Sequence, residues 1–449
     1  MVEHLPEVAG GVSAQAGSGE PDQIRRTTLP GGLRVVSEVV PGSRSFSVGF
    51  FVNTGSRHEA PHLHGVSHFL EHVLFKGTKR RRPEEISAAI ERVGGDINAY
   101  TAKEHTCFYA QVLHDDRRIA VDVLTDMLGS SLVRSVDVDS EREVILDEIA
   151  MHNDDPTDVA HELVTSRLFA GSPLERSVIG SKASIEALER RQIASYWRRH
   201  YRGPAIVVAA AGRVDHDRLA EALVPFAEQI AASTPAPRLP SGHSRRGESA
   251  VLLHRRPLEH SQAVLGFRSP GLFSAPGEFD RTRAALNLLA MILGGGMSSR
   301  LFVEVREHRG LAYSIDAGEM AYTDAGCVTI EWGSAPERVP EIAAIVRDTI
   351  ADVITDGVTP DELARAKGQM TGQLLLGLEG SSARMSRIGL GELLGDYRTV
   401  DEVAEIYRAV TVTDLQRAAA DGLGVRPVLA VVGARVSRPR LSTLVQRWL

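Results

Sequence analysis

The feature that most constrains this chain is an internal repeat, in which the second half echoes the first at an offset of about 216 to 221 residues. The segment SVGFFVNTGS at 47–56 resembles AVLGFRSPGL at 263–272, and RGPAIVVAAAGRV at 202–214 resembles VRPVLAVVGARV at 425–436. Each is an apolar strand that runs into a glycine turn. Helical periodicity lies between the strands of both halves, at 116–128 and at 338–354. The repeat therefore predicts two similar domains.

Turn signals and strand spacing indicate the class of fold. The LPGG turn at 29–32 is typical of a hairpin, and strands of mixed spacing favour antiparallel pairing with helices packed on one face. We therefore expect an α+β fold of two homologous domains, each a mostly antiparallel β-sheet packed against helices. The length of 449 residues agrees, because one hydrophobic core rarely supports so long a chain. The alternative is a chance likeness between two unrelated α/β domains.

Composition places the domain boundaries. Residues 1–24 contain neither an apolar segment nor an Arg-rich amphipathic pattern, so we expect a flexible tail there. Residues 231–249 are rich in Pro, Ser, Gly and Arg, a composition that resists both helix and sheet and is typical of a linker. The predicted domains consequently cover residues 25–230 and 250–449.

Charge and cysteine content exclude several classes of function. The 51 basic and 58 acidic residues give a net charge of -7, so the chain has no general attraction to nucleic acid. No run approaches the roughly 20 apolar residues that cross a bilayer, and we expect no membrane span. Cys107 and Cys327, the only cysteines, lie in apolar strand-like runs, which favours a reducing, cytoplasmic compartment.

The segment GVSHFLEHVLFKGT at 65–78 predicts a metal site. His68, Glu71 and His72 stand at i, i+3 and i+4, so they share one face of a helix whose other positions are apolar. Two neutral imidazoles suit Zn²⁺, and a carboxylate on the same face can deprotonate a zinc-bound water. We therefore predict zinc with Glu71 as general base. The alternative is a chance HxxEH, of which about 0.04 are expected in this composition.

A catalytic zinc needs a third protein ligand, and the sequence offers Glu148. The stretch at 139–155 reads as a helix, on which Glu141 and Glu148 are seven residues apart and share a face. This spacing can place one carboxylate on the metal and the other behind it. The alternative for acidic residues on a helix is a solvated face.

These motifs resemble the inverted zinc motif of the pitrilysin-type (M16) metallopeptidases, the inverzincins. HFLEHVLFKGT, ERVGGDINAYTAKEHT and EREVILDEI match the family pattern, and the likeness covers residues 28–449. It is closest to the mitochondrial processing peptidase β-subunit and its bacterial relatives. The resemblance implies His68, His72 and Glu148 as ligands of one Zn²⁺ per chain. It also implies Glu71 as the base and Glu141 as a residue that supports the metal ligands without binding the metal itself.

The resemblance also implies where substrate binds. GGDINAYT at 94–101 resembles the family's edge strand, which pairs with an extended peptide, and Asn98 and Ala99 are the expected contacts. The alternative is an ordinary strand after a Gly-Gly turn. ALNLLAMILGGGM at 285–297 lacks the ligands, so the second half should bind no metal there. Arg306 and Tyr313 match an Arg/Tyr pair near the scissile carbonyl, although a surface Arg and a core Tyr are also consistent.

The function that the resemblance implies is that of a zinc-dependent endopeptidase, which cleaves peptides or unfolded segments in a closed chamber. Family members of this type need four such domains to close a chamber, and this chain holds two, so a dimer is expected, either homodimeric or heterodimeric. The runner-up is a non-catalytic scaffold or partner subunit of a processing-peptidase-like complex. A metal-binding chaperone that holds peptides without cutting them is a further alternative.

Overall fold

The computed structural model describes residues 24–232, 239–242, 250–273, 278–434 and 436–448. The first strand begins at Ile24, the last residue of the predicted tail, and the rest of that tail lies outside the described residues. Much of the predicted linker, at 233–238 and 243–249, lies outside them as well.

The first half forms a six-stranded sheet in the order β1-β2-β6-β3-β5-β4. All neighbouring strands are antiparallel except β2 and β6. The strands are β1 (Ile24–Thr28), β2 (Arg34–Val39), β3 (Ser45–Val52), β4 (Asp96–Thr101), β5 (Thr106–Leu113) and β6 (Ile206–Gly212). The strand β4 lies at one edge, so its outer side has no partner strand in the described residues.

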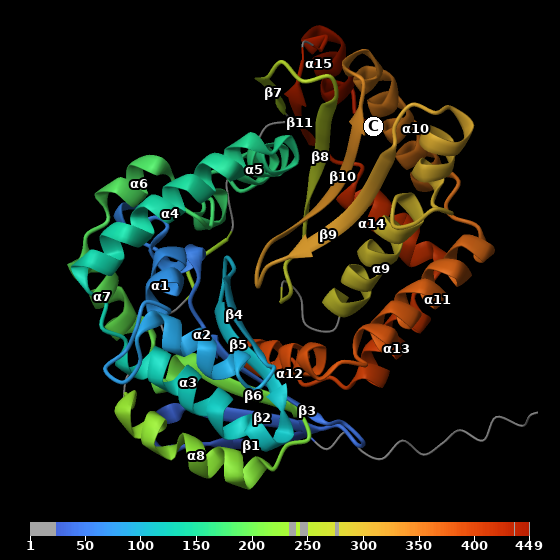
Figure 1. The fold of residues 1–449 in the computed structure, drawn as a ribbon. Coiled ribbons are helices and arrows are strands. Elements are labelled where there is room, and N and C mark those ends of the chain that lie inside the picture. The colour runs from blue at the N-terminus through green and yellow to red at the C-terminus, as the bar shows by residue number, and fades with distance from the viewer. Residues whose placement is uncertain (1–23, 233–238, 243–249, 274–277, 435, 449) are drawn as a thin grey trace, which may run out of the picture.

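Among the residues that the structure describes, the second half repeats this sheet without a counterpart of β1. Its order is β7-β11-β8-β10-β9, with β7 and β11 parallel and the other pairs antiparallel. The strands are β7 (Ala250–Arg255), β8 (Ser261–Ser269), β9 (Ser314–Ala321), β10 (Gly326–Ser334) and β11 (Val428–Gly433). The predicted α+β class and the repeat are confirmed, since the echoing segments form β3 and β8 and then β6 and β11 (Figure 1).

Helices connect the strands in both halves, including the two that helical periodicity predicts, α3 and α10. The first half contains α1 (Val66–Leu74), α2 (Pro83–Glu91), α3 (Arg117–Ser130), α4 (Ser135–Asp154), α5 (Pro156–Leu168), α6 (Lys182–Ala187), α7 (Arg190–His200) and α8 (His216–Gln229). The second contains α9 (Glu278–Leu293), α10 (Val339–Thr355), α11 (Pro360–Gly377), α12 (Ser381–Leu394), α13 (Val400–Ala409), α14 (Val412–Gly422) and α15 (Arg438–Gln446). Among the described helices, none is both long and apolar enough to cross a membrane.

One face of each sheet carries helices of its own half, and the two largest hydrophobic cores lie there. In the first core Phe50 of β3 is fully buried together with Phe69 of α1 and Leu124 of α3. In the second core Ile330 of β10 is fully buried together with Ile342 of α10. Because α1 is part of the first core, its position relative to the sheet is fixed by apolar packing.

The expectation of helices on one face only is wrong, because the opposite face of each sheet is covered by a helix from the other half. Met385 of α12 packs with Phe51 of the first sheet, and Val164 of α5 packs with Val264 of the second. Figure 1 shows α12 beside the strands of the first sheet and α5 beside those of the second. The reason is that the central strands are apolar on both faces: every residue of β6 is buried.

Candidate metal centre

The position of α1 is set where the helix begins. The carboxylate of Glu59 accepts hydrogen bonds from the main-chain N–H groups of Gly65 and Ser67, both at 2.8 Å. Such an acceptor satisfies N–H groups that have no partner within the helix. Gly65 has a φ of 88°, which glycine adopts readily. A Cβ at this position would lie only 2.7 Å from the side chain of Ile185, so a larger residue would not fit here. Buried groups therefore fix the direction in which α1 presents its polar face.

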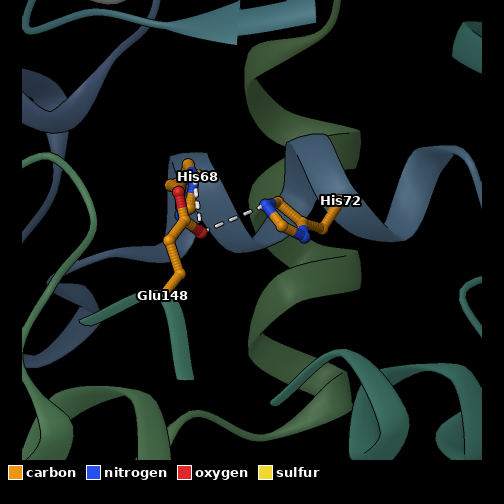
Figure 2. A group of neighbouring side chains, drawn as sticks. All are labelled: His68, His72 and Glu148. Atoms are coloured by element: carbon orange, nitrogen blue, oxygen red, sulfur yellow. Dashed lines mark ion pairs between the residues drawn. The ribbon is translucent and has the colours of Figure 1, made fainter. Parts of the chain in front are cut away.

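The helix α1 presents the HxxEH side chains on the face that the spacing predicts. Its apolar positions are all buried: Val66, Phe69, Leu70, Val73 and Leu74. His68 and His72 point toward Glu148 of α4, whose carboxylate lies between the two imidazoles (Figure 2). Burial of the apolar side thus leaves His68 and His72 to face one carboxylate from a second helix.

His68, His72 and Glu148 bring one ligand atom each to within 4.8 Å of one another. The Oε2 atom of Glu148 lies 3.5 Å from Nε2 of His68 and 3.6 Å from Nε2 of His72. This oxygen is buried and has no hydrogen-bond partner. A buried carboxylate oxygen without a partner is costly, which indicates a place for a further group.

The chemistry of these donors fits zinc. Burial and, to a lesser degree, the neighbouring His72 lower the pKa of His68 to about 3, so His68 is neutral at physiological pH. Two imidazoles and one carboxylate are a ligand set of catalytic Zn²⁺, which keeps a fourth position open. In the part of the chain that the structure describes, no other group of three such side chains lies close enough to hold a metal ion.

The buried carboxylate of Glu141 contacts the His72 ring on the Nδ1 side. The Oε2 atom of Glu141 accepts a hydrogen bond from Nδ1 of His72 at 3.2 Å, and its Oε1 atom lies 2.6 Å from Nζ of Lys76. Because a carboxylate only accepts, this contact places the imidazole proton on Nδ1 and leaves the Nε2 lone pair free. Sequence reasoning assigns Glu141 here but misses Lys76. The signal was available, because Lys76 follows His72 by one helical turn in the same segment.

The carboxylate of Glu71 is held from the edge strand. The hydroxyl of Thr101, the last residue of β4, donates a hydrogen bond to Oε2 of Glu71. Burial raises the pKa of Glu71 above its ordinary value, and the bond from Thr101 acts in the opposite direction. Sequence reasoning gives Thr101 no role, because a contact between residues 30 positions apart depends on how α1 lies against β4.

The predicted substrate strand is an edge strand of the sheet. Within the described part of the chain, β4 pairs with β5 alone, where Asn98 lies opposite Tyr109 and Ala99 lies opposite Phe108. The side chain of Asn98 is exposed, and its Oδ1 atom accepts a hydrogen bond from the N–H of Ala99 at 2.8 Å. The side chain of Asn98 thus bonds a main-chain donor of the edge strand.

Arg306 and Tyr313 lie together in the second half. The guanidinium carbon of Arg306 is 4.9 Å from the centre of the Tyr313 ring and 4.8 Å from that of Phe302. Tyr313 is 82% exposed, so it is not the core tyrosine that was the alternative. Within the described residues, no hydrogen bond or ion pair joins Arg306 or Tyr313 to the side chains of the candidate metal centre, which are His68, Glu71, His72, Glu141 and Glu148.

Comparison with known families finds two matching models. The model described as insulinase (peptidase family M16) matches residues 34–182, which include His68, Glu71, His72 and Glu148. The model described as the peptidase M16 inactive domain matches residues 187–370. The match that contains the candidate metal ligands and the match that is named inactive thus fall on successive parts of the chain, and the second begins within the first half.

Curated relatives and solved structures agree with these models. The chain is 44% identical over 416 residues to an uncharacterized zinc protease of Streptomyces coelicolor, covering 91% of this chain and 89% of the relative. It is 42% identical over 422 residues to an uncharacterized zinc protease of Mycobacterium tuberculosis, covering 93% and 94%. The crystal structure of a protease from Helicobacter pylori has the same fold, with a TM-score of 0.83, 19% identity and coverage of 92% and 99%.

Proposed function

This chain belongs to the insulinase (M16) family of peptidases, and from that premise we propose that it is a zinc-dependent endopeptidase acting on peptides or unfolded segments. The observation that carries the proposal is the convergence of His68, His72 and Glu148 beside Glu71. The relatives that are named zinc proteases support it at 42% to 44% identity.

His68, His72 and Glu148 would hold the zinc ion, one per chain. When bound, zinc supplies a Lewis acid that polarises the scissile carbonyl and makes water more acidic. Glu141 and Lys76 keep the His72 ring oriented, so that its Nε2 lone pair faces Glu148 rather than solvent. The protein thereby sets the ligand positions before substrate arrives.

Glu71 acts as general base and then as general acid in this proposal. One carboxylate oxygen takes a proton from the attacking water and delivers it to the amine nitrogen of the departing peptide. Its raised pKa suits both steps, because a weakly basic carboxylate holds a proton too briefly to pass it on. Thr101 limits the rotation of Glu71 and thereby aims the other oxygen.

The substrate would bind as an extra strand on β4. An open edge donates and accepts main-chain hydrogen bonds, which gives affinity for an extended peptide without a strict sequence requirement. Asn98 and Ala99 are the proposed contacts, and the peptide would replace the bond between their side chain and N–H group. Folded proteins present few free extended segments, so peptides and unfolded segments are the proposed substrates.

The proposed assembly is a dimer that encloses the substrate in a chamber. Arg306 and Tyr313 would then donate hydrogen bonds to the developing oxyanion of the substrate, from the partner subunit. The exposure of Tyr313 and the stacked position of Arg306 support a role at an interface or chamber wall. A homodimer is the simplest arrangement, and a heterodimer with a related subunit is the alternative.

The test is cleavage of a mixed peptide library by the purified chain, with and without a zinc chelator. We expect fragments from many peptides, their loss when chelator is added, and their return with added zinc. Cleavage that persists in full after the metal is removed would contradict the proposal. An absence of cleavage by zinc-loaded protein would favour the scaffold role.

A further inference from the structure

Two equivalent carboxylates of the repeat meet at a single buried arginine. Glu104 lies in the turn between β4 and β5, and Asp324 lies in the turn between β9 and β10. They are 220 residues apart, the same offset as Cys107 and Cys327. Both bind Arg57, which has no exposed surface. The two halves of the chain therefore meet, turn against turn, at one guanidinium.

The bonds around Arg57 involve three segments of chain. Its Nη1 donates to Oε1 of Glu104, its Nη2 donates to Oδ1 of Asp324 at 2.6 Å, and its Nε donates to the carbonyl of Pro240 at 2.8 Å. The carboxylate of Glu104 also accepts from the N–H of Thr323 at 3.0 Å and from its hydroxyl at 2.9 Å. A guanidinium has its donors in a rigid planar fork, so these partners have fixed relative positions.

Arg57, Glu104 and Asp324 form a cluster that is packed too tightly for its side chains to move apart. The N–H of Gly242 donates to Oδ2 of Asp324 at 2.9 Å, and a Cβ on Gly242 would lie 2.5 Å from Oδ1 of that carboxylate. On the other side, the N–H of Arg57 donates to the carbonyl of Lys103 at 2.7 Å, in the turn that follows β4. Displacing either turn would leave the buried guanidinium of Arg57 without one of its carboxylate partners, which is strongly destabilising.

The position of the cluster relates it to substrate binding. The strands β4 and β9 each lie at one edge of their sheet, and each ends directly before one of the two joined turns. Figure 1 shows the end of β4 beside the end of β9. The bonds at Arg57 thus fix the position of the end of β4 relative to the end of β9.

We propose that Arg57, acting through Glu104 and Asp324, is a positioning residue that holds the edge strand β4 in place for an extended peptide. This inference rests on the proposed peptidase function. The end of β4 is then held in place by contacts with the second half of the chain as well as by its pairing with β5. Loosening the cluster should therefore weaken substrate pairing along β4 while leaving the metal ligands in place.

The chain provides a matched control in a second ion pair between the halves. Arg384 of α12 donates to Oε1 of Glu38 on β2, and Glu38 is buried. Three strands, β6, β3 and β5, separate β2 from β4 in the sheet. Glu38→Gln therefore loosens a contact between the halves without touching the edge strand. Arg57 itself stays unchanged in the test, because its removal would leave two carboxylates without their partner.

The experiment compares zinc-loaded wild type, Glu104→Gln, Asp324→Asn and Glu38→Gln with an internally quenched peptide. For Glu104→Gln and Asp324→Asn we expect KM to rise about tenfold while kcat stays within about twofold, the pattern of lost substrate binding. Amide hydrogen exchange over residues 96–105 should become faster in both. Glu38→Gln should change neither KM nor this exchange, and all four proteins should keep their zinc.

Three results would overturn the inference. The first is that KM and the exchange rate of Glu104→Gln stay at the wild-type values. The second is that KM rises equally in Glu38→Gln, and the third is that kcat falls and zinc is lost in Glu104→Gln or Asp324→Asn. The first would show that β5 alone holds β4, and the second that any loosening of the halves has this effect. Turnover by the wild type tests the proposed function separately, because the exchange over 96–105 is measured without substrate.

Discussion

The hydroxyl of Thr101, at the end of the edge strand β4, donates a hydrogen bond to the carboxylate of Glu71 on α1. This bond joins the strand proposed to bind the peptide to the group proposed to move its proton. Both ends are fixed, because α1 is packed into the core of the first half and β4 is paired with β5. Glu71 is therefore oriented before any substrate binds.

Thr101→Val should lower kcat. The loss of a hydrogen bond to a charged group costs about 1.5 to 3 kcal/mol, which corresponds to a fall of about 10- to 100-fold in kcat. Thr101→Ser keeps the hydroxyl and should restore most of the rate. Steady-state kinetics of the three proteins checks this, with zinc content as the control for an intact site. A wild-type kcat in Thr101→Val would show that Glu71 needs no such support.

Lys76→Met should weaken zinc binding. The Nζ of Lys76 is 2.6 Å from Glu141, and its loss leaves a buried carboxylate without its cation behind His72. Changes to groups that orient a metal ligand typically cost 10- to 100-fold in affinity, and we expect a loss of about that size. Competition with a chelator of known zinc affinity measures it. Lys79→Met, at an exposed lysine nearby, is the control and should bind zinc like the wild type.

The stability of the fold should depend on pH through Glu59. Burial raises the pKa of Glu59 from 4.5 to about 7, although its hydrogen bonds from Gly65 and Ser67 act in the opposite direction. A raised pKa in the folded state means that the stability present below pH 4.5 is lost as pH rises through 7. The difference between the two pKa values of Glu59 corresponds to a loss of about 3 kcal/mol in the free energy of unfolding over this pH range.

Glu59→Gln removes this titration, so its free energy of unfolding should fall less than that of the wild type between these pH values. Urea unfolding of both proteins across the range provides the comparison, and only the difference between them is interpreted because other groups titrate equally in both. Two parallel curves would mean that Glu59 stays ionised in the folded protein.

A mixture of two inactive variants should regain activity if the second half of one subunit serves the metal site of the other. Glu71→Gln lacks the base, and Arg306→Ala lacks the proposed donor to the oxyanion. A mixed dimer that acts across subunits holds one site with both groups intact. We expect about a quarter to a half of the wild-type rate from the mixture, depending on how freely the subunits exchange. No recovery, despite mixed dimers, would place Arg306 in the same subunit as its site.

Local patterns in the sequence predicted the parts of the molecule that depend on local structure. The i, i+3, i+4 spacing of His68, Glu71 and His72 predicted one face of a buried helix, and α1 has that face. The helix that carries Glu141 and Glu148 was likewise predicted from its periodicity. The repeat predicted two similar domains, and the five strands β2, β6, β3, β5 and β4 of the first sheet have counterparts in the same order in the second.

The contacts made across the chain could not be predicted in this way. The bonds of Arg57 to Glu104 and Asp324 join residues 47 and 267 positions apart, and periodicity holds no information about such pairs. The exchange of α5 and α12 between the halves was also missed. A signal for it existed, since the continuous apolar run of β6 is typical of a strand buried on both faces.

The central claim is that His68, His72 and Glu148 hold a zinc ion beside Glu71 for peptide hydrolysis. Zinc content and peptide cleavage measured on the same samples of wild type and Glu71→Gln test it most directly. The account predicts about one zinc per chain in both proteins and a fall in turnover of at least about 100-fold in Glu71→Gln, the usual size of a general-base contribution. A wild type without zinc, or a Glu71→Gln protein that cleaves at the wild-type rate, would contradict it.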